Sequence, residues 1–596
     1  MTADNLNNMR VIPDLLAINE KVRPNKVAYR QFDDKSKTWI SVTWKEFADM
    51  VRSWRKAFTA SGLSKGDHAA VLLPNSITAT ACDLSILSQG MVPVPLHAVD
   101  KILFVPRTLR WNAMLNAQKE YPYLKLVVTT GNDAEGASED SPVPVVNLSD
   151  WLKQGENTDL KEVSIDPDDL AAIVYTSGTT GKPKGVMLTH DNVLSNVKSF
   201  SQVIDVGSDD VFLSFLPFSH TFERTVTFYF TLFLGAEVGF ARSVLKLAED
   251  LKIIRPTIFV AVPRVFEQFH SRIKASLQSK GSIAATLADQ AEMIGWRRFC
   301  RRNGLAVPSS SASWLDSFIW PMLESRIVLP IRDVFGGRLR IAIAGGAALN
   351  NAIGRFYNAM GVELRQGYGL TETSPVISVN RENCNNPVTV GQPIPGLQIR
   401  LGDIEELQVK GPTVMKGYWK RPDATAEVFT EDGWFRTGDQ ADLSDAGRIR
   451  IKGRIKEIIV TSTGEKIPPT DMELAIQTDP LFEQVMVVGE ARPFITALAV
   501  VNEAEWEKFA KEFNVDPSDD RMLMRRDIRM AALKRLKKAA SRFPQYGIPR
   551  NIRLLKEHWT VDNGCLTVTM KLRRPIIREK LRAEIDELYT VPQNNV

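Results

Sequence analysis

The sequence predicts an α/β protein with a large amino-terminal domain of parallel and mixed sheets, a small β-barrel-like subdomain and a small α+β carboxyl-terminal domain. Over residues 27–260, short apolar runs alternate with helical patterns, as where residues 69–73 (AAVLL) precede the helical pattern of residues 78–89. This alternation is typical of strand–helix–strand units and parallel sheets. Beyond Gly391, short strands separated by Gly and Pro turns predict the β-rich subdomain.

Further segments complete the expected domain plan. Residues 258–262 form an apolar run that predicts a buried strand, and residues 271–335 are mostly helical and rich in Arg and Trp. The pattern changes again at residues 447–456, and the roughly 140 residues that follow are enough for one compact domain. We therefore expect a large domain over residues 1–452 and a small domain over residues 453–596.

Composition argues against several classes of protein. Of the 596 residues, 44% are hydrophobic and 24% are charged, which is ordinary for a globular chain and unlike a disordered or fibrous one. The four cysteines lie far apart without C-x-x-C spacing, so we expect neither a zinc site nor a disulfide framework, and a reducing compartment is favoured. The first ten residues lack the pattern of a signal peptide, which predicts a cytoplasmic protein, with contact to the inner membrane periphery left open.

Two segments bear on membranes and nucleic acids. Residues 225–241 are the most apolar stretch, but Glu237 interrupts them and they fall short of the roughly 20 residues of a membrane span, so we expect a buried helix. Residues 521–538 (RMLMRRDIRMAALKRLKK) have the pattern of a basic amphipathic helix. The favoured interpretation is a solvated face with its apolar stripe on the core, followed by a membrane-surface patch and then a nucleic-acid patch. We expect no nucleic acid partner.

A glycine-rich loop follows the apolar run of residues 170–174, and residues 175–185 read YTSGTTGKPKG. Glycines let backbone amides approach an anion, hydroxyls donate hydrogen bonds and lysines neutralise charge. Pro183 occupies the position where a Walker loop has Ser or Thr, so the segment is a different phosphate-binding pattern. The alternative interpretation is a solvated turn that precedes a helix beginning near Asp191. The candidate phosphate-binding residues are Thr176, Ser177, Gly178, Thr179, Thr180, Gly181, Lys182 and Lys184.

Further segments follow this loop in order, and together they resemble the acyl-adenylate-forming (AMP-binding) superfamily from about residue 24 to residue 574. The amino-acid sequences of the motifs are most similar to those of bacterial long-chain fatty acyl-CoA synthetases. Family members usually carry a helix before the strand at residues 101–105, whereas here the preceding connection is short. The segments are residues 216–224 (LPFSHTFER), 344–347 (AGGA) with 366–374 (QGYGLTETS), 433–439 (GWFRTGD), 453–459 (GRIKEII) and 563–572 (NGCLTVTMKL).

The resemblance implies a two-step reaction. A carboxylate is a poor acyl donor because its leaving group would be oxide, so ATP converts the acid to acyl-AMP with release of pyrophosphate, and coenzyme A then takes the acyl group. The implied substrates are a fatty acid, ATP and coenzyme A. Mg²⁺ is implied as well, with Glu372 and Thr176 as ligands, because this hard cation prefers oxygen ligands.

The resemblance also assigns the nucleotide pocket. Tyr368 is similar to the residue that stacks on adenine, although a core tyrosine would be the interpretation if it stood alone. Gly346, Gln366 and Gly367 would line the base, and Thr371 would approach the α-phosphate.

Four more residues complete the implied machinery. Asp439 is suited to accept hydrogen bonds from the ribose hydroxyls, with Arg454 as an added donor. Lys571 resembles the family's mobile lysine, which bridges the carboxylate and the α-phosphate and stabilises the charge of the transition state. Lys456 resembles the hinge around which the small domain rotates between the two half-reactions; a solvated lysine is the alternative.

The acyl side of the site is the least defined. His220 positions the substrate carboxylate or packs beside an acyl tunnel, with Phe222 next to it; a core histidine is equally favoured. Together with Phe222, the residues Phe228, Tyr229, Phe230 and Phe233 form an aromatic cluster that walls an acyl channel or, for most members, fills the core.

The expected activity is that of an AMP-forming long-chain fatty acid:CoA ligase. The alternatives are a fatty acyl-AMP ligase or acyl-carrier-protein synthetase and, in another class, a non-catalytic acyl- or nucleotide-binding protein at the membrane. A homodimer and peripheral membrane contact stay open.

Overall fold

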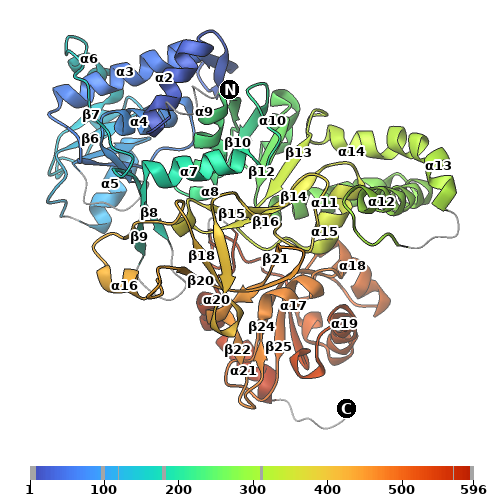
Figure 1. The fold of residues 1–596 in the computed structure, drawn as a ribbon. Helices are drawn as coiled ribbons and strands as arrows, with labels where there is room; N and C mark the ends of the chain where they lie inside the picture. The colour runs from blue at the N-terminus through green and yellow to red at the C-terminus, as the bar shows by residue number, and fades with distance from the viewer. Residues whose placement is uncertain are drawn as a thin grey trace.

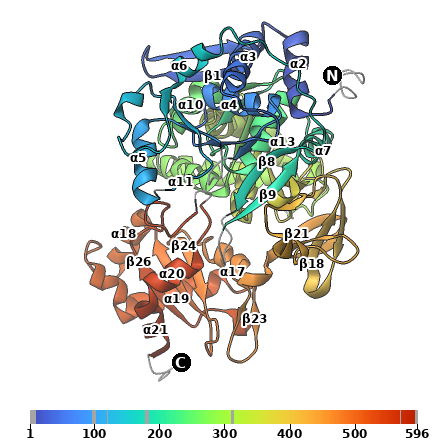
Figure 2. The same cartoon turned by 90° about the vertical axis from the view of Figure 1, so that its left-hand side faces the viewer.

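The computed structural model describes residues 9–94, 101–118, 120–176, 183–308, 313–567 and 570–590. The large amino-terminal region lies above the carboxyl-terminal region in both views of the ribbon (Figures 1 and 2). Parallel and mixed sheets with helices form the large region, and a smaller α+β unit follows it, which confirms the predicted fold class. The connection before residue 101 that we singled out lies largely outside the described residues.

A nine-stranded sheet forms the centre of the large region, with the order β16-β15-β14-β13-β12-β10-β11-β1-β2. Its six inner strands run parallel, and β2, β15 and β16 pair antiparallel at the edges. Parallel pairing puts the carboxyl ends of β12, β13 and β14 at one edge, where ligands bind in open α/β sheets. The strands are β1 (Val27–Asp33), β2 (Thr38–Thr43), β10 (Val211–Ser214), β11 (Glu237–Phe240), β12 (Ile258–Ala261), β13 (Ile341–Ala344), β14 (Leu364–Gly369), β15 (Val376–Val379) and β16 (Gln392–Pro393).

A second, fully parallel sheet has the order β4-β3-β5-β6-β7. The predicted helix at residues 78–89 is α4 (Ile77–Ser88), which contacts strands of both sheets and is buried on every side. A helix that is apolar all round is one enclosed by protein, as here. The strands are β3 (His68–Val71), β4 (Val92–Val94), β5 (Ile102–Val105), β6 (Leu126–Thr129) and β7 (Val145–Asn147).

Helices cover these sheets. α3 begins at a capping box in which Thr43 and Glu46 satisfy each other's backbone amides, a standard helix start. The helices of this part are α2 (Ile12–Val22), α3 (Trp44–Ala60), α5 (Thr108–Ala117), α6 (Leu148–Gln154), α7 (His190–Ser201), α10 (Leu247–Ile254) and α15 (Asn351–Ala359).

Residues 225–241 are not one helix, which corrects our expectation. A π-helical segment (Arg224–Tyr229) continues into α9 (Phe230–Leu234), and the helix ends at Gly235, whose φ of 68° is left-handed. Glycine adopts this conformation without the penalty of a Cβ, so it ends helices efficiently. The rest of the stretch is strand β11, which apolar content alone does not distinguish from helix.

The helical pattern of residues 271–335 is confirmed. α11 (Pro263–Ser279), α12 (Ser282–Arg302), α13 (Asp316–Leu323), a π-helical turn (Glu324–Val328) and α14 (Leu329–Asp333) project from one side of the large region (Figure 1). α12 packs closely on α15, and Gly295 permits this because a Cβ there would lie 2.0 Å from the carbonyl oxygen of Ala359.

The β-rich segment beyond Gly391 forms a four-stranded antiparallel sheet, β17-β18-β20-β21. Its strands are β17 (Gln398–Leu401), β18 (Glu406–Lys410), β20 (Phe435–Asp445) and β21 (Arg448–Arg454). A three-stranded sheet beside it holds β8 (Leu170–Thr176), β9 (Lys184–Thr189) and β19 (Gly417–Tyr418), and the short α16 (Pro422–Ala426) follows.

The carboxyl-terminal unit has its own hydrophobic clusters around the sheet β24-β25-β26. The predicted helix at residues 521–538 is shorter: a 3₁₀ turn (Asp520–Met524) precedes α19, whose apolar stripe is buried against this sheet. Among the described residues, none of the helices has the length and apolar character to cross a bilayer. The elements are β22 (Ile459–Val460), β23 (Lys466–Ile467), α17 (Pro469–Ile476), β24 (Phe482–Val488), β25 (Thr496–Val501), α18 (Glu503–Glu512), α19 (Arg526–Ala539), β26 (Asn551–Leu555), α20 (Arg574–Lys580) and α21 (Arg582–Thr590).

Candidate active site

A cavity of about 1770 Å³ lies between the large region and the carboxyl-terminal unit, and residues of both line it. It is large enough for a nucleotide together with an organic acid. The candidate residues that line it are Thr176, Lys184, His220, Phe222, Gly346, Gly367, Tyr368, Thr371, Glu372, Arg454, Lys456 and Lys571. Of the other candidates, Gln366 and Asp439 are buried behind the cavity wall, and residues 177–182 lie outside the described residues.

The ends of the glycine-rich loop reach the cavity on the hairpin β8–β9. Thr176 pairs with Lys184 across the two strands, and the Thr176 hydroxyl donates to the Lys184 carbonyl oxygen at 3.4 Å. The Lys184 ammonium lies 4.8 Å from the centre of the Tyr418 ring, a cation–π contact. The hairpin therefore presents a hydroxyl and a cation to the cavity at the base of the loop.

Glu372 lies opposite this hairpin, in the 3₁₀ turn Thr371–Thr373 that follows β14. Its Oε1 accepts a hydrogen bond from the Tyr418 hydroxyl at 2.8 Å, and Tyr418 lies on β19, which pairs with β9. Burial and the Glu372 charge both raise the pKa of Tyr418, so the hydroxyl stays a donor at neutral pH. Tyr418 thus orients the carboxylate, a role that no motif in the sequence indicated.

Asp439 joins two of the candidate nucleotide residues. Its Oδ2 accepts from the Tyr368 hydroxyl at 2.5 Å, and its Oδ1 lies 2.9 Å from Nε of Arg454. The hairpin β20–β21 pairs Asp439 with Arg454, which explains their contact although fourteen residues lie between them in the chain. The Asp439 charge raises the pKa of Arg454, whereas burial raises the pKa of Asp439 against the opposing effect of the guanidinium. We take the pair to be ionised, because Tyr368 and Arg454 both stabilise the carboxylate.

Glycines let the chain pass close to the cavity after β13. A Cβ on Gly345 would lie 2.7 Å from the Phe222 ring, and Gly346 has a φ of 81°, in the left-handed region. Gly367, one strand away on β14, also lines the cavity. A side chain at Gly345 would therefore collide with Phe222, and the left-handed φ of Gly346 disfavours any other residue there.

The acyl side of the cavity begins at His220. Its Nδ1 accepts from the backbone amide of Phe222 at 3.3 Å and so caps the short helix α8 (Thr221–Glu223). Burial, with a smaller effect from Lys571, lowers the pKa of His220 to about 4. The imidazole is therefore neutral at neutral pH and contributes no charge to a bound carboxylate.

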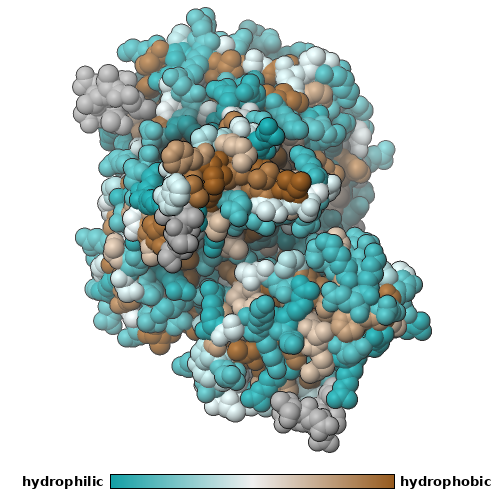
Figure 3. Space-filling model, turned by 90° about the vertical axis from the view of Figure 1, so that its right-hand side faces the viewer, coloured by the Kyte–Doolittle hydropathy of each residue, from teal (hydrophilic) through white to brown (hydrophobic). Residues whose placement is uncertain are grey.

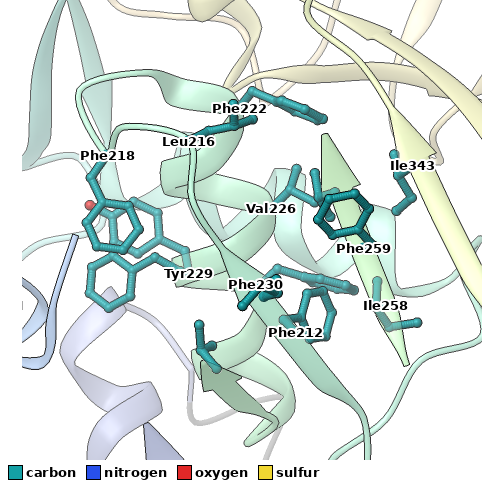
Figure 4. Packing of buried hydrophobic residues seen from close by; sticks show 14 of the residues in the cluster. Phe212, Leu216, Phe218, Phe222, Val226, Tyr229, Phe230, Ile258, Phe259 and Ile343 are labelled. Atoms are coloured by element: carbon teal, nitrogen blue, oxygen red, sulfur yellow. The ribbon is translucent and has the colours of Figure 1, made fainter. Parts of the chain in front are cut away.

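Apolar side chains continue this branch of the cavity. Phe222 and Val226 lie one helical turn apart on the side that faces Ile343 (Figure 4), and Phe200 and Val379 line the same cavity. The other aromatic residues of the predicted cluster do not line it: Phe228, Tyr229, Phe230 and Phe233 are buried in the core, as expected for most of them.

Lys571 extends from the carboxyl-terminal unit into the cavity. Its backbone is held by Thr567, whose Oγ1 accepts from the Lys571 amide at 3.1 Å, and its side chain is exposed within the cavity. Enclosure by the cavity walls and the Arg454 charge lower the pKa of Lys571, and Asp439, Glu457 and Glu372 oppose them. The ammonium is thus within electrostatic reach of both the Asp439 cluster and Glu372.

Polar contacts hold the carboxyl-terminal unit in this position. Arg264 on α11 lies 2.6 Å from Glu483 on β24, and Glu483 also contacts His558 at 3.2 Å. Asn350 donates to the Leu474 carbonyl oxygen at 3.1 Å. Lys456, the predicted hinge, lies in the 3₁₀ turn Ile455–Glu457 between the two parts. Its role stays a prediction.

Glu223 is a buried acid that the sequence interpretation missed. Its carboxyl oxygens accept from Ser214 at 2.6 Å and Thr227 at 3.1 Å, and the residue has no exposed surface. Burial raises the pKa of Glu223 from its ordinary value of 4.5 to about 8. The burial of Glu223 depends on tertiary packing, which the sequence does not show directly. The only signal in the sequence is that Glu223 lies between Phe222 and the apolar stretch of residues 225–241.

We expect Glu223→Gln to remove part of the pH dependence of stability. The pKa of Glu223 is higher in the folded state than in the unfolded state, so the folded state binds its proton more tightly. The contribution of Glu223 to the free energy of unfolding is therefore constant below about pH 4.5 and falls by about 1.4 kcal/mol per pH unit between pH 4.5 and 8. Urea unfolding at several pH values measures the slope. Parallel slopes for the wild type and the variant would contradict the assignment; Glu249→Gln, at an exposed acid, is the control.

The parallel sheet, the nucleotide-sized cavity at its carboxyl edge and the lysine from a second unit define an adenylate-forming class of enzyme. The chain belongs to the AMP-binding enzyme family: residues 16–419 match that family, and residues 456–592 match the AMP-binding enzyme C-terminal domain.

Relatives of known name extend over nearly the whole chain. A Mycobacterium bovis protein named a long-chain-fatty-acid–CoA ligase is 30% identical, with 96% of each chain covered. An Arabidopsis thaliana chloroplast protein named a long-chain-fatty-acid–acyl-carrier-protein ligase is 29% identical, covering 98% of this chain and 87% of the relative. The adenylation domain of a Mycobacterium chelonae carboxylate reductase has the same fold, with a TM-score of 0.75, 22% identity and coverage of 99% and 93%.

Proposed function

We propose that this protein is an AMP-forming long-chain fatty acid:CoA ligase. The observation that carries the proposal is the position of Lys571, which enters one cavity with Glu372, Tyr368 and Arg454. That cavity continues along Phe222 and Val226 into an apolar branch suited to an alkyl chain. Each methylene buried there contributes about 0.8 kcal/mol, so long acids are favoured. The names of the M. bovis relative and of a Cavia porcellus relative that is 30% identical over 94% of this chain support the same substrate class.

The residues divide the first half-reaction among them. Thr176 and Lys184 contact the outer phosphates, Tyr368 stacks on adenine, and Asp439 with Arg454 fixes the ribose side. The acid lies with its chain along Phe222 and its carboxylate beside His220, facing the α-phosphorus. Lys571 then neutralises the negative charge that develops between the carboxylate and the α-phosphate, which is the step where a preorganised cation has the largest effect.

The second half-reaction requires a thiol to reach the acyl-adenylate after Lys571 withdraws. We propose that residues 453–596 move as one domain about Lys456, away from residues 1–452. The separate hydrophobic clusters of the carboxyl-terminal unit support such movement, since few apolar contacts would have to break. Coenzyme A is the proposed thiol; the name of the Arabidopsis relative keeps an acyl carrier protein as the second candidate.

A magnesium ion fits the residues on the cavity wall. The described residues contain no cluster of three or more acidic, His or Cys side chains that could hold an ion alone. Mg²⁺ commonly uses one or two carboxylates together with substrate phosphates, and Glu372, oriented by Tyr418, with Thr176 opposite, offers that set. When bound, the ion would neutralise phosphate charge.

We expect Glu372→Gln to lower the rate of adenylation by about a hundredfold or more and to raise the Mg²⁺ concentration that gives half-maximal rate, because an amide is a weaker ligand. Pyrophosphate release measured across a magnesium titration tests this. Glu427→Gln, at another acid on the cavity wall, should leave the titration unchanged. An unchanged magnesium dependence in Glu372→Gln would contradict the metal role.

A panel of fatty acids scored for ATP-dependent pyrophosphate release tests the function as a whole. We expect release with long-chain acids and thioester formation when coenzyme A is added. Thioester formation with carrier protein alone would replace the proposal by the acyl-carrier-protein alternative. Absence of pyrophosphate release across the panel would favour a binding protein without catalysis.

A further inference from the structure

The helical projection carries an apolar stripe that faces solvent. Trp314 is 68% exposed, Phe318 77%, Met322 43% and Leu329 45%. The first three recur every four residues, so they lie on one face of α13 and the turn that precedes it. Figure 3 shows a continuous brown patch on this side of the molecule. Large apolar side chains gathered on a surface mark an interaction site, whereas single ones need no explanation.

The opposite face of α13 is firmly attached to the protein, so the stripe is not a displaced core face. Trp320 and Leu323 are buried, and the guanidinium of Arg298 lies 4.9 Å from the Trp320 ring. Arg297 and Asp316, both buried, form an ion pair that ties α12 to the start of α13. The packing therefore fixes the orientation in which Trp314 and Phe318 point outward.

The charge around the stripe is mostly positive. In the described part of residues 290–332, every exposed charged side chain is an arginine: Arg298, Arg301, Arg302 and Arg326. The acidic residues of this stretch, Glu292, Asp316 and Glu324, are buried or half-buried. Two exposed acids border it: Asp289, which lies 3.7 Å from Lys274, and Asp333, at the end of α14. An apolar helix face surrounded by more exposed cations than acids matches the chemistry of a membrane surface, where apolar side chains enter the acyl boundary and cations meet anionic headgroups.

We propose that the stripe formed by Trp314, Phe318, Met322 and Leu329 docks the protein on anionic lipid bilayers. A second copy of the chain is disfavoured as the occupant, because a self-complementary contact would bring the four arginines of each copy toward each other with fewer exposed acids than cations to pair with them. Helix α19, the segment where the sequence suggested a membrane patch, has its apolar stripe buried and exposes a single large apolar side chain, Met530, on its charged face. The docking site stands independently of the proposed ligase activity.

Vesicle co-sedimentation of the full chain tests the proposal. The probes are phosphatidylcholine vesicles with about 30% phosphatidylglycerol and vesicles of phosphatidylcholine alone. We expect binding to the anionic vesicles that weakens with salt, and little binding to the neutral ones. Phe318→Ser with Met322→Ser should reduce binding at least tenfold, and Arg326→Gln should reduce it severalfold. Because these side chains are exposed, the fold should tolerate the changes, which circular dichroism verifies.

The matched control is Leu245→Ser, which removes another apolar side chain that is 94% exposed but lies outside the stripe. It should bind vesicles as the wild type does. Equal binding by the stripe double variant and the wild type would overturn the proposal. A second set of results would also overturn it: the wild type does not bind vesicles and forms dimers in sedimentation velocity, whereas the double variant is monomeric. The stripe would then be a contact between two copies of the chain. No arm of the experiment depends on ligase activity.

Discussion

Lys571→Ala should lower the rate of acyl-adenylate formation by at least about a hundredfold while leaving thioester formation from supplied acyl-AMP nearly unchanged. The reason is geometric: the ammonium enters the cavity that Glu372 and Arg454 line, and no other lysine of the carboxyl-terminal unit lines it among the described residues except Lys456. Removing the cation leaves the charge of the transition state unopposed, whereas attack by a thiol does not require it. Pyrophosphate release and thioester formation, assayed separately, measure the two steps.

Two control variants separate this effect from general damage. Lys537→Ala removes an exposed lysine of α19 and should change neither half-reaction. Arg264→Ala breaks the 2.6 Å contact with Glu483 and should slow adenylation only modestly, since it weakens the docking of the unit that carries Lys571 without removing the cation. Equal loss of both half-reactions in Lys571→Ala would refute the assigned role.

The fold class could be predicted from the sequence, because the alternation of strand and helix patterns is visible in short segments of the chain. The prediction was wrong about residues 225–241, where Gly235 ends the helix and β11 begins, since uniformly apolar residues have no period to distinguish the two. The helix predicted over residues 521–538 also begins later than expected, because Asp520–Met524 form a 3₁₀ turn and α19 begins at Arg526. Both errors concern boundaries, which depend on tertiary packing more than on composition.

The candidate site divides in the same way. Residues such as Tyr368 and Glu372 could be predicted from the motifs, because the residue types that contact phosphates and nucleotides occur together in short segments. The contacts that position the site residues join segments far apart in the chain: Tyr418 on β19 donates to Glu372, and Arg264 contacts Glu483 of the carboxyl-terminal unit, which carries Lys571. No local pattern encodes such pairs. The fixed, outward orientation of Phe318 likewise follows from packing on the other face of its helix.

Asp439→Asn should reduce adenylation by about two orders of magnitude and raise KM for ATP. The carboxylate holds Tyr368 at 2.5 Å and Arg454 at 2.9 Å, the two side chains that it presents to the cavity, and it is the proposed acceptor for the ribose hydroxyls. The substitution leaves Arg454 without its partner, but the Arg454 side chain is 42% exposed to the cavity, so solvent screening limits the loss of stability to about 1 kcal/mol. The variant should therefore also unfold at lower temperature. Pyrophosphate release across an ATP titration, with thermal unfolding in parallel, measures both.

A double variant distinguishes a role in the fold from a role in nucleotide binding. In Asp439→Asn with Arg454→Gln the unbalanced charge is gone, so thermal stability should return most of the way to the wild-type value. Activity should stay low, because neither the ribose acceptor nor the guanidinium is restored. Asp442→Asn, on the same strand but away from the cavity, should match the wild type in both measurements. If activity recovered together with stability in the double variant, Asp439 would be a structural residue and the nucleotide assignment would fail.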